Sequence, residues 1–340
     1  MKLTERIQAF SQLHARLSAW PTDEKQAIFA QAKAKNPWFT EESCERAVSG
    51  ILAFLEKEAL QTWVSAYPIT DAPSGKRVGL VLAGNIPLVG FHDLLCVLIS
   101  GHKAHVKLSS QDEVLPRFLI HELIRIDSYF AQAIELTERL NQMDAVIATG
   151  SDNTARYFDY YFREIPHIVR KNRTSMAVIN GQEKPEDNER LGRDIFQYYG
   201  LGCRNVSKIF IPKEYYLPTL IDSLEPYHEV INHNKYVNNY EYRRSIFLVN
   251  KYPHLDNGFL LFEESTQLVS PIGVLYYERY EDEQSLKALL DANADKIQCV
   301  VSNQAWWPNS FDFGQAQTPN LSDYADNVDT LTFLTTLAHG

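Results

Sequence analysis

Cysteine is scarce in this sequence, and its spacing argues against the common cysteine-based sites. The four cysteines of the 340-residue chain lie far apart: Cys44, Cys96, Cys203 and Cys299. None belongs to a C-x-x-C pair, and none has a histidine at metal-ligand spacing. We therefore expect neither a disulfide framework nor a metal site.

An export signal is also missing from the start of the sequence. In MKLTERIQAF, Glu5 and Arg6 stand where such a signal would need its apolar core. We therefore expect a cytoplasmic protein, in which a reducing environment keeps the thiols free.

Positive charge is in deficit. Lysine and arginine number 33 against 43 aspartates and glutamates, which gives a formal net charge of -10. Proteins that bind nucleic acid generally need a basic field to displace counterions from phosphates, so we expect no nucleic-acid partner.

One apolar run, residues 78–100, is long enough to be considered as a membrane span. Polar residues and a proline lie within it: Asn85, Pro87, His92 and Asp93. A strand, a turn and a helix explain these residues without the cost of burying them in lipid. We therefore expect no membrane span.

The two common phosphate-binding loops, G-x-G-x-x-G and G-x-x-x-x-G-K-[ST], are absent. If the chain binds a dinucleotide, another type of loop holds it. The composition, with 45% hydrophobic and 22% charged residues, is that of an ordinary folded protein, and 340 residues favour two domains.

Helical and strand patterns alternate along most of the chain. Residues 1–70 carry apolar positions at helical spacing, broken by Pro21 and Pro37, and predict an antiparallel helical layer. Beyond the turn-rich segment 68–77, the pattern predicts strands and helices in turn: strands at 78–82, 104–110, 143–151 and 175–180, and helices at 88–99, 118–130 and 154–164.

The second half continues in the same way. Helices are predicted at 191–199, 217–224 and 284–294, and strand-like runs at 207–212 (SKIFIP), 244–250 (RSIFLVN), 272–280 (IGVLYYERY) and 297–303 (IQCVVSN).

Alternation of this kind predicts an α/β fold. Parallel strands need a crossover that is usually a helix, so the sheets should be parallel and covered by helices. We predict an N-terminal helical layer with a nucleotide-binding α/β domain (residues 1–180), a catalytic α/β domain carrying Cys203 (181–318) and a C-terminal tail (319–340). The polar stretch 181–190 is the predicted linker.

Three turns follow predicted strands, at the end where open parallel sheets bind ligands: residues 83–87, 107–110 and 149–151. The amide of Asn85 could donate to a developing oxyanion, or Asn85 could be an N-cap or turn residue. Lys107 could hold a ribose or a phosphate, or be a solvated charge. Gly150 and Ser151 could bring a pyrophosphate to backbone N–H groups at a helix start, or form an ordinary helix cap.

Cys203 differs from the other cysteines in its surroundings. Gly200 and Gly202 precede it, and glycine permits the backbone angles of a sharp, exposed turn. A thiolate on such a turn would be a competent nucleophile, whereas an isolated cysteine is more often a small buried hydrophobe. Cys44, Cys96 and Cys299 lie inside apolar patterns and fit the buried alternative.

Taken in order, these pieces resemble the aldehyde dehydrogenase superfamily, and within it the fatty acyl-CoA reductase branch typified by the luminescence acyl reductases. The segment LVLAGNIPLVGFHDLLCVLISGHKAHVKLSS is similar to the one in which an asparagine before a proline supplies the oxyanion donor and a later lysine binds the cofactor's ribose. ATGS is similar to the family's glycine-serine turn, GLGCRNVSKIFIP to its nucleophile turn, and the likeness runs from Val78 to Asn303. It implies the aldehyde dehydrogenase fold.

The same resemblance implies roles for individual residues. Cys203 would be the nucleophile and Asn85 the oxyanion donor. The cofactor would be held by Lys107, Ser109, Gly150 and Ser151.

Two departures from the superfamily pattern bear on the reaction. Hydrolytic members carry a glutamate in an ELGGK-like stretch, where this chain has VRKNRTSMAVIN. That glutamate activates the water that cleaves the acyl-enzyme, and its absence fits exchange with a thiol such as coenzyme A, which needs less base assistance. The glutamate that the family carries before the later FGP element is also missing, with QLVSPIG in its place, and Gln267 or a neighbour could contact the cofactor's ribose differently.

The predicted function is therefore an acyl-CoA reductase that forms an acyl-enzyme on Cys203 and reduces it to an aldehyde. The resemblance favours NADPH over NADH and is compatible with a homo-oligomer. Lys171 and Arg173, which lie in the replaced glutamate stretch, could meet a phosphate or form a solvated basic turn. The alternatives are an NAD(P)-dependent aldehyde dehydrogenase that runs toward the acid, and a non-catalytic protein on the same fold.

Overall fold

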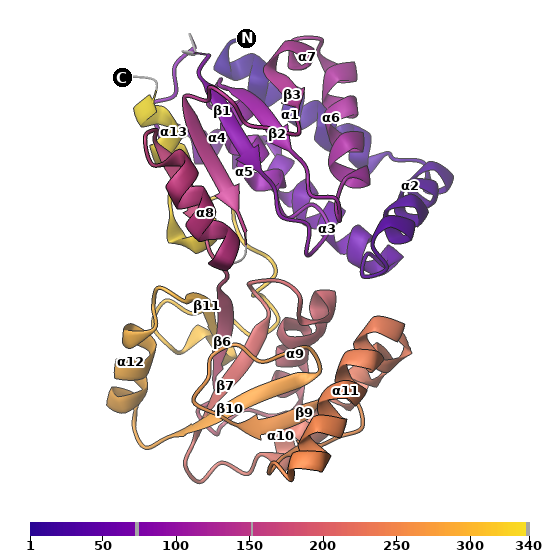
Figure 1. Cartoon of the computed structure of the whole chain (residues 1–340), viewed down its shortest axis with the longest axis vertical. Coiled ribbons are helices and arrows are strands. Elements are labelled where there is room, and N and C mark those ends of the chain that lie inside the picture. The colour runs from indigo at the N-terminus through magenta and orange to yellow at the C-terminus, as the bar shows by residue number, and fades with distance from the viewer. Residues whose placement is uncertain (72–74, 151, 338–340) are drawn as a thin grey trace. The chain divides into compact units, whose positions relative to one another are not determined.

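The computed structural model describes residues 1–71, 75–150 and 152–337. The chain divides into two compact units (Figure 1). Unit 1 comprises Met1–Asn172 together with the chain from Asn320 onward, and unit 2 comprises Arg173–Pro319. The chain thus leaves unit 1, forms unit 2 and returns to unit 1.

Helices open unit 1. They are α1 (Leu3–Ser18), α2 (Thr22–Lys35), α3 (Glu41–Leu55) and α4 (Lys57–Ser65). In α1, residues spaced by three or four positions face the core, where Phe10 and Leu13 are fully buried. Pro21 stands immediately before α2, where its missing N–H costs no helical hydrogen bond. The predicted helical layer is confirmed.

The sheet of unit 1 is parallel throughout, in the order β3-β2-β1-β4-β5. Its strands are β1 (Arg77–Val81), β2 (Lys103–Lys107), β3 (Ile134–Leu136), β4 (Ala145–Thr149) and β5 (His167–Arg170). The helices that connect them are α5 (Phe91–Ile99), α6 (Val114–Ile126), α7 (Phe130–Ala133) and α8 (Asp152–Phe162). The fully buried residues Val78, Leu80 and Ala145–Ala148 explain why β1 and β4 read as continuous apolar runs.

The last described segment of the chain completes unit 1. It includes η4 (Ala325–Asn327) and α13 (Thr330–Leu337), and α13 packs against α5. The Arg170 side chain on β5 donates to Asp93 Oδ1 at 2.6 Å, to the Ala325 carbonyl at 2.5 Å and to Thr330 Oγ1 at 2.8 Å. One buried guanidinium therefore joins the sheet, α5 and the returning segment.

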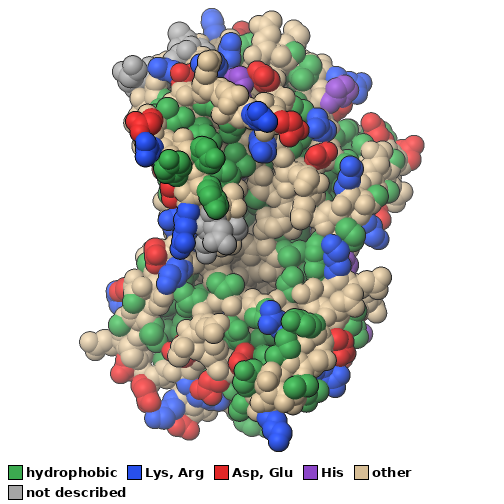
Figure 2. Space-filling view, viewed as in Figure 1, with side chains coloured by type: hydrophobic (Ala, Val, Ile, Leu, Met, Phe, Trp, Pro, Cys, Tyr) green, Lys and Arg blue, Asp and Glu red, His purple; other side chains and the backbone are tan. Residues whose placement is uncertain are grey.

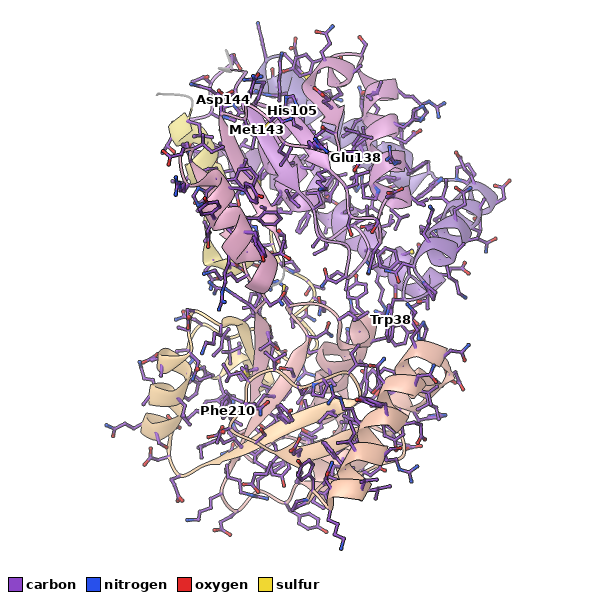
Figure 3. The ribbon with its side chains drawn as sticks, viewed as in Figure 1. Trp38, His105, Glu138, Met143, Asp144 and Phe210 are labelled. Carbon is purple, nitrogen blue, oxygen red and sulfur yellow. The ribbon has the colours of Figure 1, made fainter. Side chains whose placement is uncertain are left out.

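Unit 2 contains a second sheet in the order β11-β6-β7-β10-β9-β8, parallel except for the β8–β9 pair. Its strands are β6 (Thr174–Val178), β7 (Val206–Pro212), β8 (Leu255–Asp256), β9 (Leu261–Glu264), β10 (Val274–Tyr280) and β11 (Ile297–Ser302). Its helical segments are α9 (Pro185–Phe196), η1 (Gln197–Gly200), α10 (Pro218–Ser223), η2 (Glu225–Asn232), α11 (Asn234–Asn250), α12 (Glu283–Ala292) and η3 (Asn303–Ala305). Phe210, labelled in Figure 3, lies in the core of this unit with Met176 and Tyr280.

The parallel, helix-covered α/β architecture agrees with the sequence prediction, but three boundaries differ. The division lies at Asn172 rather than at residue 180, because β6 pairs with β7 and β11 of the second sheet. The segment from Asn320 packs within unit 1 and is not a separate tail. The predicted linker at 181–190 is largely helical, since α9 begins at Pro185, a residue favoured in the first helical turn.

The run RSIFLVN, predicted as a strand, is the C-terminal part of α11. His233 caps this helix by accepting from the Tyr236 N–H, and Tyr236, Tyr240 and Phe247 are buried along one face. The apolar run at 246–249 continues that helix, and short apolar runs of this kind do not distinguish strand from helix.

Candidate functional site

The predicted turns of unit 1 meet at one edge of its sheet. Strand β1 lies between β2 and β4, and all three are parallel, so the loops that follow them emerge at the same edge. The chain moves from β1 toward β2 and β3, then crosses to β4 and β5 on the other side. In open α/β sheets such a switch point is where ligands bind.

The loop after β1 places Asn85 at this edge. Asn85 is exposed, whereas Gly84 before it is buried. A Cβ atom at Gly84 would lie 2.5 Å from Ser109 Oγ, so glycine is needed for the β1 and β2 loops to pack so closely. We name residues 84–88 the Asn85 turn.

The loop after β2 carries Lys107 and Ser109. The Lys107 carbonyl accepts from the Leu82 N–H at 3.1 Å, while its side chain is exposed. Ser109 Oγ accepts from the Gln111 N–H at 3.2 Å, and the Asp112 N–H donates to the Ser109 carbonyl at 3.1 Å. The β2 loop is thus a closed turn beside the Asn85 turn.

A buried carboxyl group, which the sequence analysis missed, joins the two loops. Asp112 is 4% exposed, and its Oδ2 accepts from the Leu88 N–H at 2.7 Å. Leu88 has a left-handed backbone with φ 58°, which a leucine rarely adopts. Burial raises the pKa of Asp112 to about 7, against the opposing effect of the Leu88 N–H.

The loop after β4 begins at Gly150, whose N–H donates to the Arg170 carbonyl at 3.3 Å. A Cβ atom there would lie 3.1 Å from the Thr154 side chain and 3.2 Å from Phe158, so glycine lets α8 start close to the strand. Ser151, the other residue predicted for this turn, lies outside the described residues.

Cys203 occupies a corner of a tight turn in unit 2, between α9 and β7. The Asn205 N–H donates to the Gly202 carbonyl at 3.0 Å, and the Gly202 N–H donates to Asn205 Oδ1 at 2.8 Å. These two bonds close residues 202–205, which we name the Cys203 turn, with Cys203 and Arg204 at its centre.

Asn205 also fixes this turn to the preceding helix. Its side-chain Nδ2 is within hydrogen-bond distance of the carbonyls at the end of α9: Asp194 at 3.0 Å, Ile195 at 3.2 Å and Gln197 at 2.7 Å. Asn205 is 2% exposed. The sequence carried one signal for this role of Asn205, its position three residues after Gly202, and the sequence analysis did not use it.

The entry to the Cys203 turn is unusual. Tyr198, Tyr199 and Gly200 all have left-handed backbones, with φ of 53°, 58° and 78°, whereas Gly202 does not. Left-handed tyrosines cost roughly 1–3 kcal/mol each and persist where the surroundings hold them. The Tyr199 ring packs on His233 with ring centroids 4.4 Å apart. The sequence predicted a sharp turn made possible by Gly200 and Gly202. In the structure, the left-handed positions are those of Gly200 and two tyrosines.

Further contacts of the Cys203 turn come from β6 and from the loop after β11. The Ser175 hydroxyl donates to the Cys203 carbonyl at 3.0 Å and lies 3.1 Å from Cys299 Sγ. The Arg204 side chain donates to the Ala316 carbonyl at 3.2 Å and lies over the Phe311 ring at 5.3 Å. The backbone on both sides of the Cys203 side chain is thus fixed.

A second buried carboxylate holds the loop that Arg204 contacts. Asp194, fully buried on α9, accepts from the Gly314 N–H at 2.6 Å and the Ala316 N–H at 2.9 Å. Burial raises the pKa of Asp194 to about 7. The sequence analysis did not single out this residue, because one carboxylate inside an amphipathic helix resembles a solvated one.

Cys203 is the half-buried cysteine, whereas Cys44, Cys96 and Cys299 are buried. Burial raises the pKa of the Cys44 thiol to about 12 and that of Cys96 well above its ordinary value. Thiols with raised pKa values are poor nucleophiles at neutral pH, so Cys44 and Cys96 are structural.

The basic run that replaces the family's glutamate is partly structural. Arg170 is in the buried network described above, and Arg173 donates to the Ile297 carbonyl at 3.2 Å. The Lys171 N–H donates to Asp326 Oδ2 at 3.3 Å. Gln267 is exposed, and its N–H donates to Ser265 Oγ at 3.2 Å.

The described residues give little support to a metal site or a membrane span. In the described ranges, no group of three or more His, Cys, Asp or Glu side chains is arranged to hold a metal ion. The helices in those ranges are too short or too polar to cross a membrane. Figure 2 shows acidic and basic side chains scattered over the visible surface of both units.

A family model described as acyl-CoA reductase (LuxC) matches residues 20–219, more than half of the chain. The chain belongs to the LuxC acyl-CoA reductase family. Members of this family are NAD(P)-dependent oxidoreductases that reduce acyl-CoA to aldehyde, so the predicted enzyme class is confirmed. The matched range of this LuxC-family chain contains Asn85, Lys107, Ser109, Gly150 and Cys203.

Solved structures confirm the aldehyde dehydrogenase fold. Aldehyde dehydrogenase 21 from Physcomitrella patens, in complex with succinate, has a TM-score of 0.69 at 11% identity and covers 99% of this chain and 85% of its own. A Mycobacterium tuberculosis aldehyde dehydrogenase complexed with NAD+ has a TM-score of 0.64 at 13% identity, and the match covers 89% of this chain and 73% of that protein. The NADP-dependent glyceraldehyde-3-phosphate dehydrogenase from Bacillus halodurans, complexed with NADP, has a TM-score of 0.62 at 12% identity. This match covers 89% of the LuxC-family chain and 74% of the dehydrogenase.

At these identities the likeness concerns the fold alone. No curated protein sequence matches the LuxC-family chain.

Proposed function

We propose that Cys203 is the nucleophile of this acyl-CoA reductase. Its thiolate attacks the thioester carbonyl of acyl-CoA, the bond from that carbon to the coenzyme A sulfur breaks, and coenzyme A leaves as a thiolate that takes up a proton. The acyl group is then held as a thioester on Cys203. When bound, a nicotinamide cofactor would supply the hydride that reduces this thioester; the bond from the acyl carbon to the Cys203 sulfur would then break, releasing the aldehyde and the Cys203 thiolate.

The observation that carries this proposal is the position of Cys203 at the corner of a turn fixed on every side. Asn205 closes the turn and anchors it to α9, and Ser175 holds the Cys203 carbonyl. A nucleophile held in one geometry loses less entropy on reaching the transition state. Cys44 and Cys96 are buried on helices and have raised pKa values, so neither offers an alternative.

Asn85 is the proposed oxyanion donor, together with the Cys203 backbone N–H. The support is the exposed amide of Asn85 on a closely packed turn and the family resemblance of the surrounding segment. Removal of one such donor typically lowers kcat by about 100- to 1,000-fold. Asn85→Ala should therefore lower kcat far more than it changes KM.

The cofactor is proposed to bind at the carboxyl edge of the unit 1 sheet. This edge fits a nicotinamide dinucleotide, because it lies at the switch point of a parallel sheet and Lys107 offers an exposed cation there. Lys107, Ser109 and Gly150 would hold it, and Ser151 joins them by resemblance alone. NADPH is proposed over NADH on the family resemblance.

The replaced glutamate supports release of the product as aldehyde rather than acid. Arg170 and Arg173 bind backbone and side-chain partners inside their own units, and neither can serve as a base for water. A cytoplasmic location is proposed because the chemistry needs Cys203 reduced. Assembly as a homo-oligomer stays a proposal from the resemblance.

Intact mass spectrometry tests the nucleophile. The purified chain is incubated with acetyl-, octanoyl- and palmitoyl-coenzyme A without a reductant. We expect an acyl adduct with at least one of them, lost in Cys203→Ala and retained in Cys299→Ser, which preserves a partner for Ser175. The absence of an adduct with every substrate would refute the proposal.

Two measurements separate the alternatives. An aldehyde dehydrogenase would reduce NAD(P)+ with aldehyde in the absence of coenzyme A. A non-catalytic protein would oxidise no NADPH with any acyl-CoA, and its Cys203 would react with iodoacetamide no faster than Cys44.

A further inference from the structure

Asp112 is a buried acid that the mechanism above does not use, and it contacts the Asn85 turn on both sides of Asn85. After Asn85, its Oδ2 accepts from the Leu88 N–H at 2.7 Å. Before Asn85, Gly84 lies against the turn that contains Asp112, since a Cβ atom at Gly84 would be 3.0 Å from the Asp112 nitrogen. The Asp112 side chain therefore holds the end of the turn at Leu88, while its backbone packs against the start of the turn at Gly84.

The backbone of the Asn85 turn needs such a restraint. Leu88 is held at φ 58°, where a leucine would relax toward negative φ if nothing opposed it. A carboxylate is a stronger acceptor of a backbone N–H than a neutral group, and its hydrogen bond is shorter. The bond from the Leu88 N–H to Asp112 Oδ2 opposes this relaxation.

The surroundings of Asp112 indicate that its carboxyl group does not serve packing alone. Among the described residues, Asp112 Oδ1 has no hydrogen-bond partner. The carboxyl group borders a small cavity under the Asn85 turn, lined by Leu82, Ala83, Leu88, Phe91, Leu94 and Leu119. Burying an acid in an apolar cavity costs stability, so a residue that served packing alone would be apolar.

We propose that Asp112 is a positioning residue that sets the Asn85 turn in its catalytic geometry. It acts through Asn85 and touches neither the acyl group nor the cofactor. This inference rests on the proposed role of Asn85 as oxyanion donor. It predicts that Asp112 contributes to catalysis only when Asn85 is present.

A double-mutant cycle tests this dependence. The kcat and KM of Asp112→Ala, Asn85→Ala and the double variant are measured with octanoyl-coenzyme A and NADPH, using the full chain. Asp112→Ala should lower kcat by about ten-fold or more while the KM for acyl-CoA changes by less than about three-fold. In the Asn85→Ala background, the same change should lower kcat by less than about two-fold.

Two variants serve as controls. Asp112→Asn keeps an oxygen for the Leu88 N–H and should recover most of the kcat lost in Asp112→Ala. Asp144 is the matched carboxylate at the other end of the same sheet, where it accepts from the Arg77 N–H at 2.6 Å (Figure 3). Asp144→Ala removes an exposed carboxylate bond to the first residue of β1, far from the Asn85 turn, and its effect on kcat should be equal with and without Asn85.

The outcomes are distinct. If Asn85→Ala lowers kcat and Asp112→Ala lowers it equally in both backgrounds, the inference is overturned and the role of Asn85 stands. If Asn85→Ala leaves kcat unchanged, the proposed oxyanion donor is wrong. If Asp112→Ala does not fold, Gly84→Ala replaces it, because the added Cβ displaces the same turn while the carboxylate remains. Its loss of kcat should likewise vanish without Asn85.

Discussion

Asn205 connects the Cys203 turn to its helix, and its removal should weaken both. Asn205→Ala deletes one acceptor, used by the Gly202 N–H at 2.8 Å, and one amide nitrogen placed among carbonyls 2.7 to 3.2 Å away. An amide has two protons, so the nitrogen serves about two of these carbonyls at full strength. The variant therefore loses about three hydrogen bonds.

The expected cost follows from these bonds. Each contributes about 1 kcal/mol to stability, which gives about 3 kcal/mol, and the buried Gly202 N–H left unpaired adds about 1–3 kcal/mol. The total of about 4–6 kcal/mol approaches the whole stability of an ordinary domain. Asn205→Ala should therefore unfold at much lower urea concentration than the parent chain.

Urea titration followed by tryptophan fluorescence measures this loss, since Trp306 and Trp307 belong to the same unit as the turn. Asn239→Ala is the matched control, because Asn239 on α11 makes an exposed bond to the Lys235 carbonyl at 2.8 Å. The control should lose less than about 1 kcal/mol. An equally small loss in Asn205→Ala would show that the Cys203 turn does not depend on this side chain.

Three further changes have outcomes that the structure predicts. Burial raises the pKa of Asp194 from 3.8 to about 7, so its contribution to stability is fully present below the unfolded pKa and is lost as pH rises to about 7. The shift corresponds to a decrease of about 4 kcal/mol in the free energy of unfolding between about pH 4 and pH 8. Asp194→Asn should remove most of this decrease in urea titrations across that range. A free energy of unfolding that falls with pH as steeply as in the parent chain would contradict the prediction. Arg170→Met leaves Asp93 buried without its partner and should cost about 3–5 kcal/mol, seen as a lower Tm in calorimetry; a Tm within a degree or so of the parent would contradict it. Gly192→Ala places a Cβ 2.2 Å from the Tyr227 ring and should cost about 1–3 kcal/mol by urea titration, whereas in a Tyr227→Ala background it should cost almost nothing; equal losses in both backgrounds would exclude the clash.

The fold class was accessible from the sequence because its main signals are local. Val78–Leu82 and Ala145–Thr149 are apolar runs bounded by turns, and a buried parallel strand requires such a run. The alternation of these runs with amphipathic helices leaves few arrangements other than a helix-covered parallel sheet. Elements with weaker local signals, such as β8 and β9, were not predicted.

The boundaries were less accessible because pairing partners distant in sequence decide them. Nothing local to Thr174–Val178 indicates that β6 pairs with β11, more than a hundred residues later, rather than with β5. The same holds for α13, which completes unit 1 by packing on α5. RSIFLVN is ambiguous between strand and helix by itself, and its helical state depends on the cap at His233.

The same contrast between local and distant signals applies to the candidate site. Asn85, Lys107, Gly150 and Cys203 were predicted from turns and from the family resemblance, and the structure places the first three at one edge of one sheet. Their supporting residues were not found, because Asn205, Ser175, Asp112 and Asp194 act through burial and through partners that only the folded chain supplies. The role of Cys203 itself stays a prediction until the adduct experiment is done.

The return of the chain from Asn320 into unit 1 has a consequence for how the protein is made. During synthesis on the ribosome, the whole of unit 2 is produced before the segment that contacts Arg170 and α5 exists. Domains usually fold in the order of their synthesis, but here the earlier unit waits for the later one. A nascent chain that stops before residue 320 would carry a complete second sheet and an exposed apolar surface on α5, the kind of surface that chaperones bind.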